Sequence, residues 1–207
     1  MKITKKLIKI FFILAAICFI IFPFSKANLY LRIYFTNPDV TSDDSISEGS
    51  YALYYASNIP NAFSPEQLIQ SEVDVESQCV TFKLDKNLAD NLSGLRIDFP
   101  TSDNLLCISN ITVSSAGIVQ KQFNPCVFFA DENILLTNDI GAISLASATN
   151  RAYIQTGNVD PYVILSEQMV SEIAQSFSSY RLTRLGICLF IFATYFIAKK
   201  NIFSKNV

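Results

Sequence analysis

The residues best suited to contact a ligand are three aromatic side chains, Tyr54, Tyr55 and Phe63, and a charged pair, Arg96 and Asp98. Aromatic rings could stack on the apolar face of a sugar, whose hydroxyl groups could then bond to the charged pair. The same residues also have a structural interpretation, in which alternating tyrosines pack a sheet and the charged pair lies exposed on one strand face. Such a pair contributes only about 0–1 kcal/mol to stability. We favour the structural interpretation, because the chain lacks tryptophan, the best stacking residue.

The chain contains no histidine, which removes the Ser–His–Asp and Cys–His catalytic systems and the usual mononuclear zinc site. Glycoside hydrolysis needs two carboxylates at a fixed separation, one of them with a raised pKa. Glu66 is the acid to test first, but among eighteen acidic residues some pair lies close by chance. No D-x-D motif, glycine-rich phosphate loop or EF-hand spacing is present. We therefore predict a protein that is not an enzyme, with no metal site and no cofactor.

The five cysteines fall into two groups: Cys18 and Cys188 lie in the apolar ends of the chain, and Cys79, Cys107 and Cys126 lie in the middle. Their spacing matches no metal-binding motif. We expect the middle three to be small buried hydrophobic side chains. The alternative is a single disulfide, most simply between Cys107 and Cys126, which export from the cytoplasm would permit.

The distribution of charge predicts the topology of the chain. All acidic residues lie between Asp39 and Glu172, whereas both ends are apolar segments flanked by lysine. Because positive charge beside a span stays on the cytoplasmic side, we expect transmembrane helices at residues 10–24 and 185–198, cytoplasmic basic tails at 1–9 and 199–207, and an extracytoplasmic middle. From Arg32 to Glu172, six basic residues accompany eighteen acidic ones, which argues against nucleic acid as a partner.

Two further features concern the ends of the middle region. The N-terminal segment also fits a signal peptide, with cleavage after Ala27 in Ser25-Lys26-Ala27, so an anchor and a cleaved leader both remain possible. Apolar residues at spacings of three and four predict an amphipathic helix over residues 166–184, capped by Ser166. We expect this helix to pack on the domain and to continue into the membrane.

The middle of the chain consists of short alternating runs separated by turn signals. Many short strands with few helical patterns predict a mainly β domain at residues 28–165, of the β-sandwich or jelly-roll type. The predicted strands cover residues 29–35, 51–56, 79–84, 95–99, 106–113, 118–123, 126–129, 143–145, 153–155 and 162–165.

Four stretches occur in a fixed order: ALYYASNIPNAFSPEQ, VTFKL, LSGLRIDFPTSDNLLCISNITV and TGNVDPYVIL. Together they resemble a β-sandwich domain of bacterial membrane proteins associated with modification or synthesis of O-antigen and other surface polysaccharides. The similarity spans residues 51–165. Phe99 separates Asp98 from Pro100, and Val159 is inserted, which departs from the pattern of these domains. Many such proteins also carry the domain on a multi-spanning body, so a glycosyl-transferring activity does not carry over to this chain.

The resemblance and the absence of catalytic residues imply a membrane-anchored, non-enzymatic module at the bacterial inner membrane. It would be an accessory or glycan-recognition component of surface-polysaccharide assembly or modification, with a glycan or a polysaccharide-assembly membrane protein as its partner. The alternative is a structural or docking subunit of a larger membrane complex that binds no glycan.

Overall fold

The computed structural model describes residues 28–36, 49–85, 87–101, 103–115 and 118–177, together with the single residues 13, 186 and 190. Residues Ala27–Phe177 form one compact unit. The predicted tails and spans at 1–9, 10–24, 185–198 and 199–207 lie outside the described residues, apart from those isolated positions. Within the described ranges, no helix combines the length and the apolar character that crossing a membrane requires.

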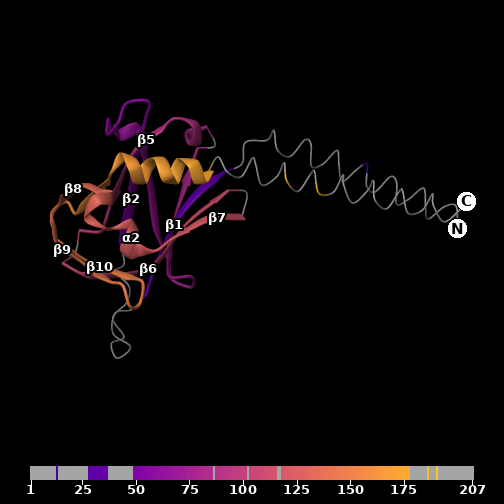
Figure 1. The fold of residues 1–207 in the computed structure, drawn as a ribbon. Coiled ribbons are helices and arrows are strands. Elements are labelled where there is room, and N and C mark those ends of the chain that lie inside the picture. The colour runs from indigo at the N-terminus through magenta and orange to yellow at the C-terminus, as the bar shows by residue number, and fades with distance from the viewer. Residues whose placement is uncertain are drawn as a thin grey trace, which may run out of the picture. The chain divides into compact units, whose positions relative to one another are not determined.

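The described domain is mainly β, with short helical segments between some of its strands (Figure 1). The strands are β1 (Leu29–Phe35), β2 (Ser50–Ser57), β3 (Leu68–Asp74), β4 (Cys79–Leu84), β5 (Leu92–Asp98), β6 (Leu105–Ser115), β7 (Ile118–Phe123), β8 (Ile134–Asn138), β9 (Ile140–Ala146), β10 (Arg151–Thr156) and β11 (Tyr162–Leu165). Four short helical segments lie between described strands: η1 (Pro65–Gln67), η2 (Leu88–Asp90), α2 (Pro125–Phe128) and η3 (Asp131–Asn133).

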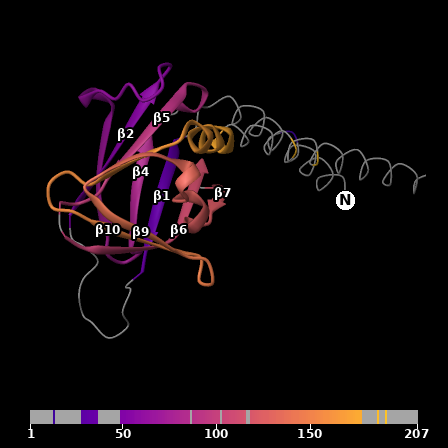
Figure 2. The same cartoon turned by 60° about the vertical axis from the view of Figure 1, so that its left-hand side comes forward.

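The strands pair in the order β8-β11-β5-β2-β3-β4-β1-β6-β10-β9, and β7 pairs with β6. We call β8, β11, β5 and β2 the β2 half of this sheet, and β4, β1, β6, β7, β10 and β9 the β1 half. Strand β3 joins the halves, because it pairs with β2 on one side and with β4 on the other. In Figure 2, β2 and β5 of the β2 half are labelled in the upper part of the domain, and β6, β9 and β10 of the β1 half are labelled in the lower part.

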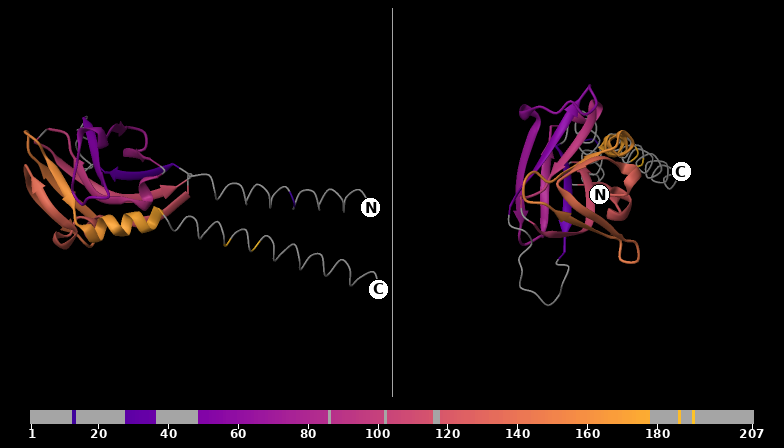
Figure 3. Two further views of the ribbon diagram at one scale, coloured as in Figure 1. Left: turned by 90° about the horizontal axis from the view of Figure 1, so that it is seen from above. Right: turned by 90° about the vertical axis from the view of Figure 1, so that its left-hand side faces the viewer.

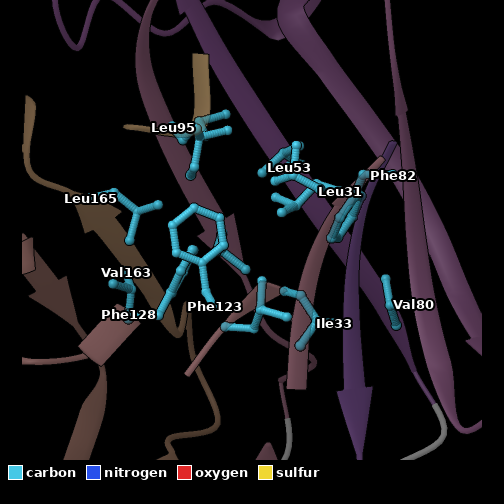
Figure 4. Packing of buried hydrophobic residues seen from close by; sticks show 14 of the residues in the cluster. Leu31, Ile33, Leu53, Val80, Phe82, Leu95, Phe123, Phe128, Val163 and Leu165 are labelled. Atoms are coloured by element: carbon cyan, nitrogen blue, oxygen red, sulfur yellow. The ribbon is translucent and has the colours of Figure 1, made fainter. Parts of the chain in front are cut away.

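The core lies on the inner face of the sheet, and both halves contribute buried residues to it. Along β1, buried residues alternate with half-buried ones, which is the period of a strand with one face in the core. Leu31 and Ile33 of the β1 half belong to the same buried cluster as Leu53 and Leu95 of the β2 half. In Figure 4 the rings of Phe123 and Phe128 lie among these side chains, and their centroids are 5.5 Å apart.

A helix at residues 167–177, orange in Figure 3, runs alongside the strands. Its predicted apolar stripe is buried in the described part, where Met169, Ile173 and Phe177 belong to the core cluster. The predicted cap is confirmed, since the Ser166 hydroxyl accepts a hydrogen bond from the Met169 backbone N–H at 3.3 Å. The continuation of this helix to residue 184 lies outside the described residues.

Most predicted strands are confirmed, but residues 126–129 do not form a strand. They belong to the helical turn α2, because Pro125 stands at its first position and the Asn124 side chain accepts from the Cys126 N–H. Two strands of the structure, β3 and β8, were not predicted. The sequence of β3 contains several polar residues that interrupt any apolar alternation, and β8 is exposed along most of its length. Neither strand therefore shows the apolar pattern that would predict it.

Candidate functional site

Three strands of the β2 half carry the side chains that come together on its outer face. The antiparallel register places Tyr54 of β2 opposite Arg96 of β5, and Asp98 of β5 opposite Tyr162 of β11. Residues two apart on a strand share a face, so Arg96 and Asp98 point the same way, as predicted. We refer to Tyr54, Arg96, Asp98, Asp160 and Tyr162 as the Arg96 cluster.

Arg96 makes the contacts that hold this cluster together. Its Nε donates to Asp98 Oδ1 at 2.6 Å and its Nη2 donates to Asp98 Oδ2 at 2.7 Å, which is a bidentate pair. Nη2 also donates to Asp160 Oδ1 at 3.3 Å. The guanidinium carbon lies 3.7 Å from the centroid of the Tyr162 ring and 5.0 Å from that of Tyr54. Arg96 is therefore fixed by two carboxylates and two aromatic rings.

The pair is less exposed than the sequence suggested, since the Arg96 and Asp98 side chains keep only 22% and 17% of their exposure. Burial raises the pKa of Asp98, an effect that the hydrogen bonds and charge of Arg96 oppose and that the charge of Asp160 reinforces. Burial by itself lowers the pKa of Arg96, but the hydrogen bonding and charge of Asp98 outweigh it, so the net shift is upward. Arg96 thus stays charged and acts as a fixed cation rather than as a proton donor.

Two of the five predicted ligand-binding residues do not join this cluster. Tyr55 follows Tyr54 on β2, so its side chain points to the opposite face, where it packs against the core. Phe63 lies in the segment between β2 and η1 and not on a strand. Tyr54 and Tyr55 therefore do not form one platform, because adjacent strand residues point to opposite faces.

Sequence reasoning missed Asp160 and Tyr162, which complete the cluster from the other side of β5. Both lie in TGNVDPYVIL, where the sequence predicted a strand at residues 162–165 but no site residue. The signal that could have found them is the pairing of β11 with β5, which joins segments more than sixty residues apart. Glu66, the acid chosen for a test of hydrolysis, has an exposed side chain in η1 and is not part of the cluster.

The cysteines of the domain are buried free thiols, so the interpretation as small hydrophobic side chains is favoured and the disulfide is not formed. Cys107 alternates with the core residues Leu106 and Ile108, and it therefore faces the outer side of β6. Cys126 instead belongs to α2, and its sulfur donates to the carbonyl oxygen of Arg151 at 3.2 Å. The Cys107 and Cys126 sulfur atoms thus lie in different surroundings, and they do not form the disulfide that was the alternative.

In the part of the chain that the structure describes, no group of three or more His, Cys, Asp or Glu side chains could hold a metal ion. The chain matches no protein-family profile, no curated protein sequence and no solved structure. The fold and the Arg96 cluster are therefore the observations that define the class of this protein. It is a mainly β domain that presents a fixed arginine between two tyrosine rings on a strand face.

Proposed function

We propose that this protein is a non-enzymatic recognition module, anchored in a bacterial inner membrane by its apolar ends, that binds a glycan of the cell surface through the Arg96 cluster. Its two half-sheets would form a sandwich of the β-sandwich or jelly-roll type. The observation that carries the proposal is the placement of the Arg96 guanidinium between the Tyr54 and Tyr162 rings. Its role would be in the assembly or modification of surface polysaccharides, as the resemblance implies.

The chemistry of the cluster supports binding rather than catalysis. Tyrosine rings offer apolar area with a polar hydroxyl at low entropic cost, and fixed charged groups orient a ligand that is rich in hydroxyls. Asp98 is held by two hydrogen bonds from Arg96 and is largely buried. It is thus a poor candidate for the freely ionising acid or base that a hydrolase needs.

The experiment is binding of the full-length chain in detergent to an array of bacterial surface polysaccharides and lipid-linked precursors. We expect saturable binding that Tyr162→Ala weakens by about tenfold, which corresponds to about 1.4 kcal/mol. Tyr153→Ala on β10 is the matched control, because it removes a half-buried tyrosine from the other half of the sheet. Arg96→Ala is less informative, since it leaves Asp98 without its partner and lowers stability. Equal binding by the parent protein and Tyr162→Ala would exclude the cluster as the site.

A second candidate function, a docking subunit that binds no glycan, is favoured by strand β8. Leu135 and Leu136 of this strand keep 56% and 50% of their exposure. Among the described strands, β8 pairs only with β11 and so lies at the edge of the sheet. Exposed apolar edge strands invite pairing with another chain. A photo-crosslinker at Leu135 should then join one membrane protein in intact cells, and Leu136→Lys should abolish the adduct; adducts to lipid alone would count against docking.

A further inference from the structure

The β1 half has a different electrostatic character from the rest of the domain. Strands β1, β4, β6, β7, β9 and β10 contain neither aspartate nor glutamate, although acidic residues outnumber basic ones eighteen to six between Arg32 and Glu172. Four of those six basic residues, Arg32, Lys83, Lys121 and Arg151, lie on these strands. The basic residues of the domain are therefore concentrated on these strands, although Lys121 is paired with Glu172 and the adjoining strand β3 carries Glu72 and Asp74.

Two neighbouring cations on the outer face of this half, Arg32 and Lys83, have no acidic partner within the described residues. Arg32 alternates with the core residues Leu31 and Ile33, and Lys83 alternates with Phe82 and Leu84, so both point outward. Within the described ranges, neither cation forms an ion pair, whereas Arg96 pairs with Asp98 and Lys121 with Glu172. Their charge remains available to a ligand.

Aromatic rings lie beside these two cations. The register places Tyr30 of β1 opposite Lys83 of β4, and Arg32 and Lys83 are consequently diagonal neighbours on one face. The Arg32 guanidinium carbon lies 5.2 Å from the centroid of the Tyr30 ring, and its Nη1 donates to the Ser114 hydroxyl at 3.0 Å. Tyr34 follows on the same face two residues further along β1, and it is partly exposed, as Tyr30 is.

The adjoining strand β6 supplies polar groups to this face. Asn110 lies opposite Tyr34, and Thr112 lies opposite Arg32. The Asn110 Oδ1 and Thr112 Oγ1 atoms are buried and have no hydrogen-bond partner among the described residues. Buried polar atoms of this kind nearly always bond to something, so these two oxygens of β6 are acceptors that the described residues leave unused.

We propose that Tyr30, Arg32, Tyr34, Lys83, Asn110 and Thr112, here called the β1–β4–β6 face, bind a short saccharide that carries a carboxylate group. Arg32 and Lys83 bind the carboxylate, since a guanidinium and an ammonium side by side match its two oxygens. The tyrosine rings pack against the apolar face of the sugar, and the polar side chains of β6 accept hydrogen bonds from its hydroxyl groups.

The acidic character of the rest of the domain narrows the choice of ligand. A long polyanion, such as nucleic acid, or an anionic membrane surface is repelled by the many carboxylates outside this half. A short ligand with one or a few carboxylates lies within about a Debye length of Arg32 and Lys83, roughly 8–10 Å, and it therefore responds mainly to them. The site is separate from the Arg96 cluster, which lies on the other half of the sheet.

The test is calorimetric titration of the full-length chain in detergent with trigalacturonic acid, with uncharged galactotriose as the comparison. We expect saturable binding of the acidic trimer and binding of the neutral trimer that is weaker by about tenfold or more. Lys83→Gln should weaken binding of the acidic trimer about tenfold and leave the fold intact, because this side chain is exposed. Arg32→Gln should have at least as large an effect, but it also removes the bond to Ser114.

The charge-matched control is Lys121→Gln, which removes one cation from β7 but breaks only a partly exposed ion pair with Glu172. Binding should change by less than about twofold in this variant, because its charge is already paired. An equal loss in Lys121→Gln and Lys83→Gln would mean that only net charge matters, and would overturn the proposal. Equal affinity for the two trimers, or no saturable binding of the acidic one at millimolar concentration, would also overturn it.

Two further measurements distinguish this proposal from a general anion site and from binding at the Arg96 cluster. Inorganic phosphate that displaces the trimer completely at equal concentration would show a general anion site and would refute recognition of a saccharide. If Tyr162→Ala abolishes binding of the acidic trimer while Lys83→Gln leaves it unchanged, the Arg96 cluster is the binding site. That result would support the function proposed above and reject the β1–β4–β6 face.

Discussion

At the scale of single residues, Asp139 determines the shape of the segment that carries Asp160. Its backbone adopts a φ of 50°, and its carboxylate accepts hydrogen bonds from the N–H groups of Val159 at 2.7 Å and Asp160 at 3.2 Å. Its carbonyl oxygen accepts from the Gly157 N–H at 2.7 Å. These bonds hold the turn before β11, and through it the Asp160 carboxylate that contacts Arg96.

Gly157 is required for this arrangement, because a Cβ atom at this position would overlap the Asp139 carboxylate. We predict that Gly157→Ala lowers the free energy of unfolding by about 1–3 kcal/mol, the usual cost of overpacking. Chemical denaturation of the folded chain measures this value. Gly141→Ala is the control, since its new methyl group would meet mainly the flexible side chain of Gln155. A loss as large in Gly141→Ala would contradict the explanation.

Asp74 gives a prediction about pH. The hydrogen bond from the Ser77 hydroxyl at 2.8 Å is the main cause that lowers the pKa of this carboxyl below its ordinary value. Desolvation opposes this shift, and the N–H groups of Glu76 and Ser77 add smaller lowering contributions. The pKa of Asp74 is lower in the folded state than in the unfolded state. The ionised carboxylate therefore stabilises the fold at pH values above the unfolded pKa, and this stabilisation is lost as the pH falls through the folded pKa. Titration followed by NMR should show this lowered pKa, and Ser77→Ala should raise it. An unchanged value in that variant would reject Ser77 as the cause.

The residue scale also shows what the sequence could reveal about the site. The Arg96–Asp98 pair was predictable, since two residues at a spacing of two on a strand share a face. The separation of Tyr54 from Tyr55 follows from the same rule, and the predicted platform ignored it. The contacts of Arg96 with Asp160 and Tyr162 depend on the pairing of β5 with β11, and hydrophobic periodicity carries no information about which strands become neighbours.

At the scale of elements, strands with one buried face were predicted and the others were not. Strand β4 alternates core and surface residues and was predicted with its observed bounds. Strand β8 exposes nearly all of its residues, so no apolar period marks it. At residues 126–129, apolar composition suggested a strand, but the Asn124 cap and Pro125 start a helical turn instead. Local capping thus outweighed composition there.

The cap of the helix at residues 167–177 can be tested directly. Ser166→Ala removes the hydroxyl that accepts from the Met169 N–H, so we predict a loss of about 1 kcal/mol in the free energy of unfolding. Ser166→Asp should retain most of the stability, because a carboxylate also caps a helix. Ser171→Ala, an exposed position within the same helix, should cost nothing, since alanine is the better helix former. Indistinguishable stabilities of Ser166→Ala and Ser171→Ala would show that the cap contributes little.

At the scale of the whole molecule, the sheet and the helix at residues 167–177 share one core. The helix contributes Met169, Val170, Ile173 and Phe177 to the cluster that also contains residues of both half-sheets. Burying a large apolar side chain contributes about 1.5–3 kcal/mol, so the four together supply on the order of 6–12 kcal/mol. That amount is comparable to the whole stability of a typical domain, about 5–15 kcal/mol.

We therefore predict that the fragment of residues 28–177 unfolds cooperatively, whereas the fragment of residues 28–165 does not fold, although it contains every strand of the sheet. Circular dichroism in the near ultraviolet during thermal unfolding distinguishes the two, because the aromatic cluster around Phe128 and Phe129 gives a signal only when it is packed. A longer fragment with Ile173→Asp tests the same point without a change in length, since it places a charge at a fully buried position. Cooperative unfolding of the shorter fragment would show that the sheet is stable without the helix, and the packing of residues 167–177 would then serve to position the end of the domain rather than to stabilise it.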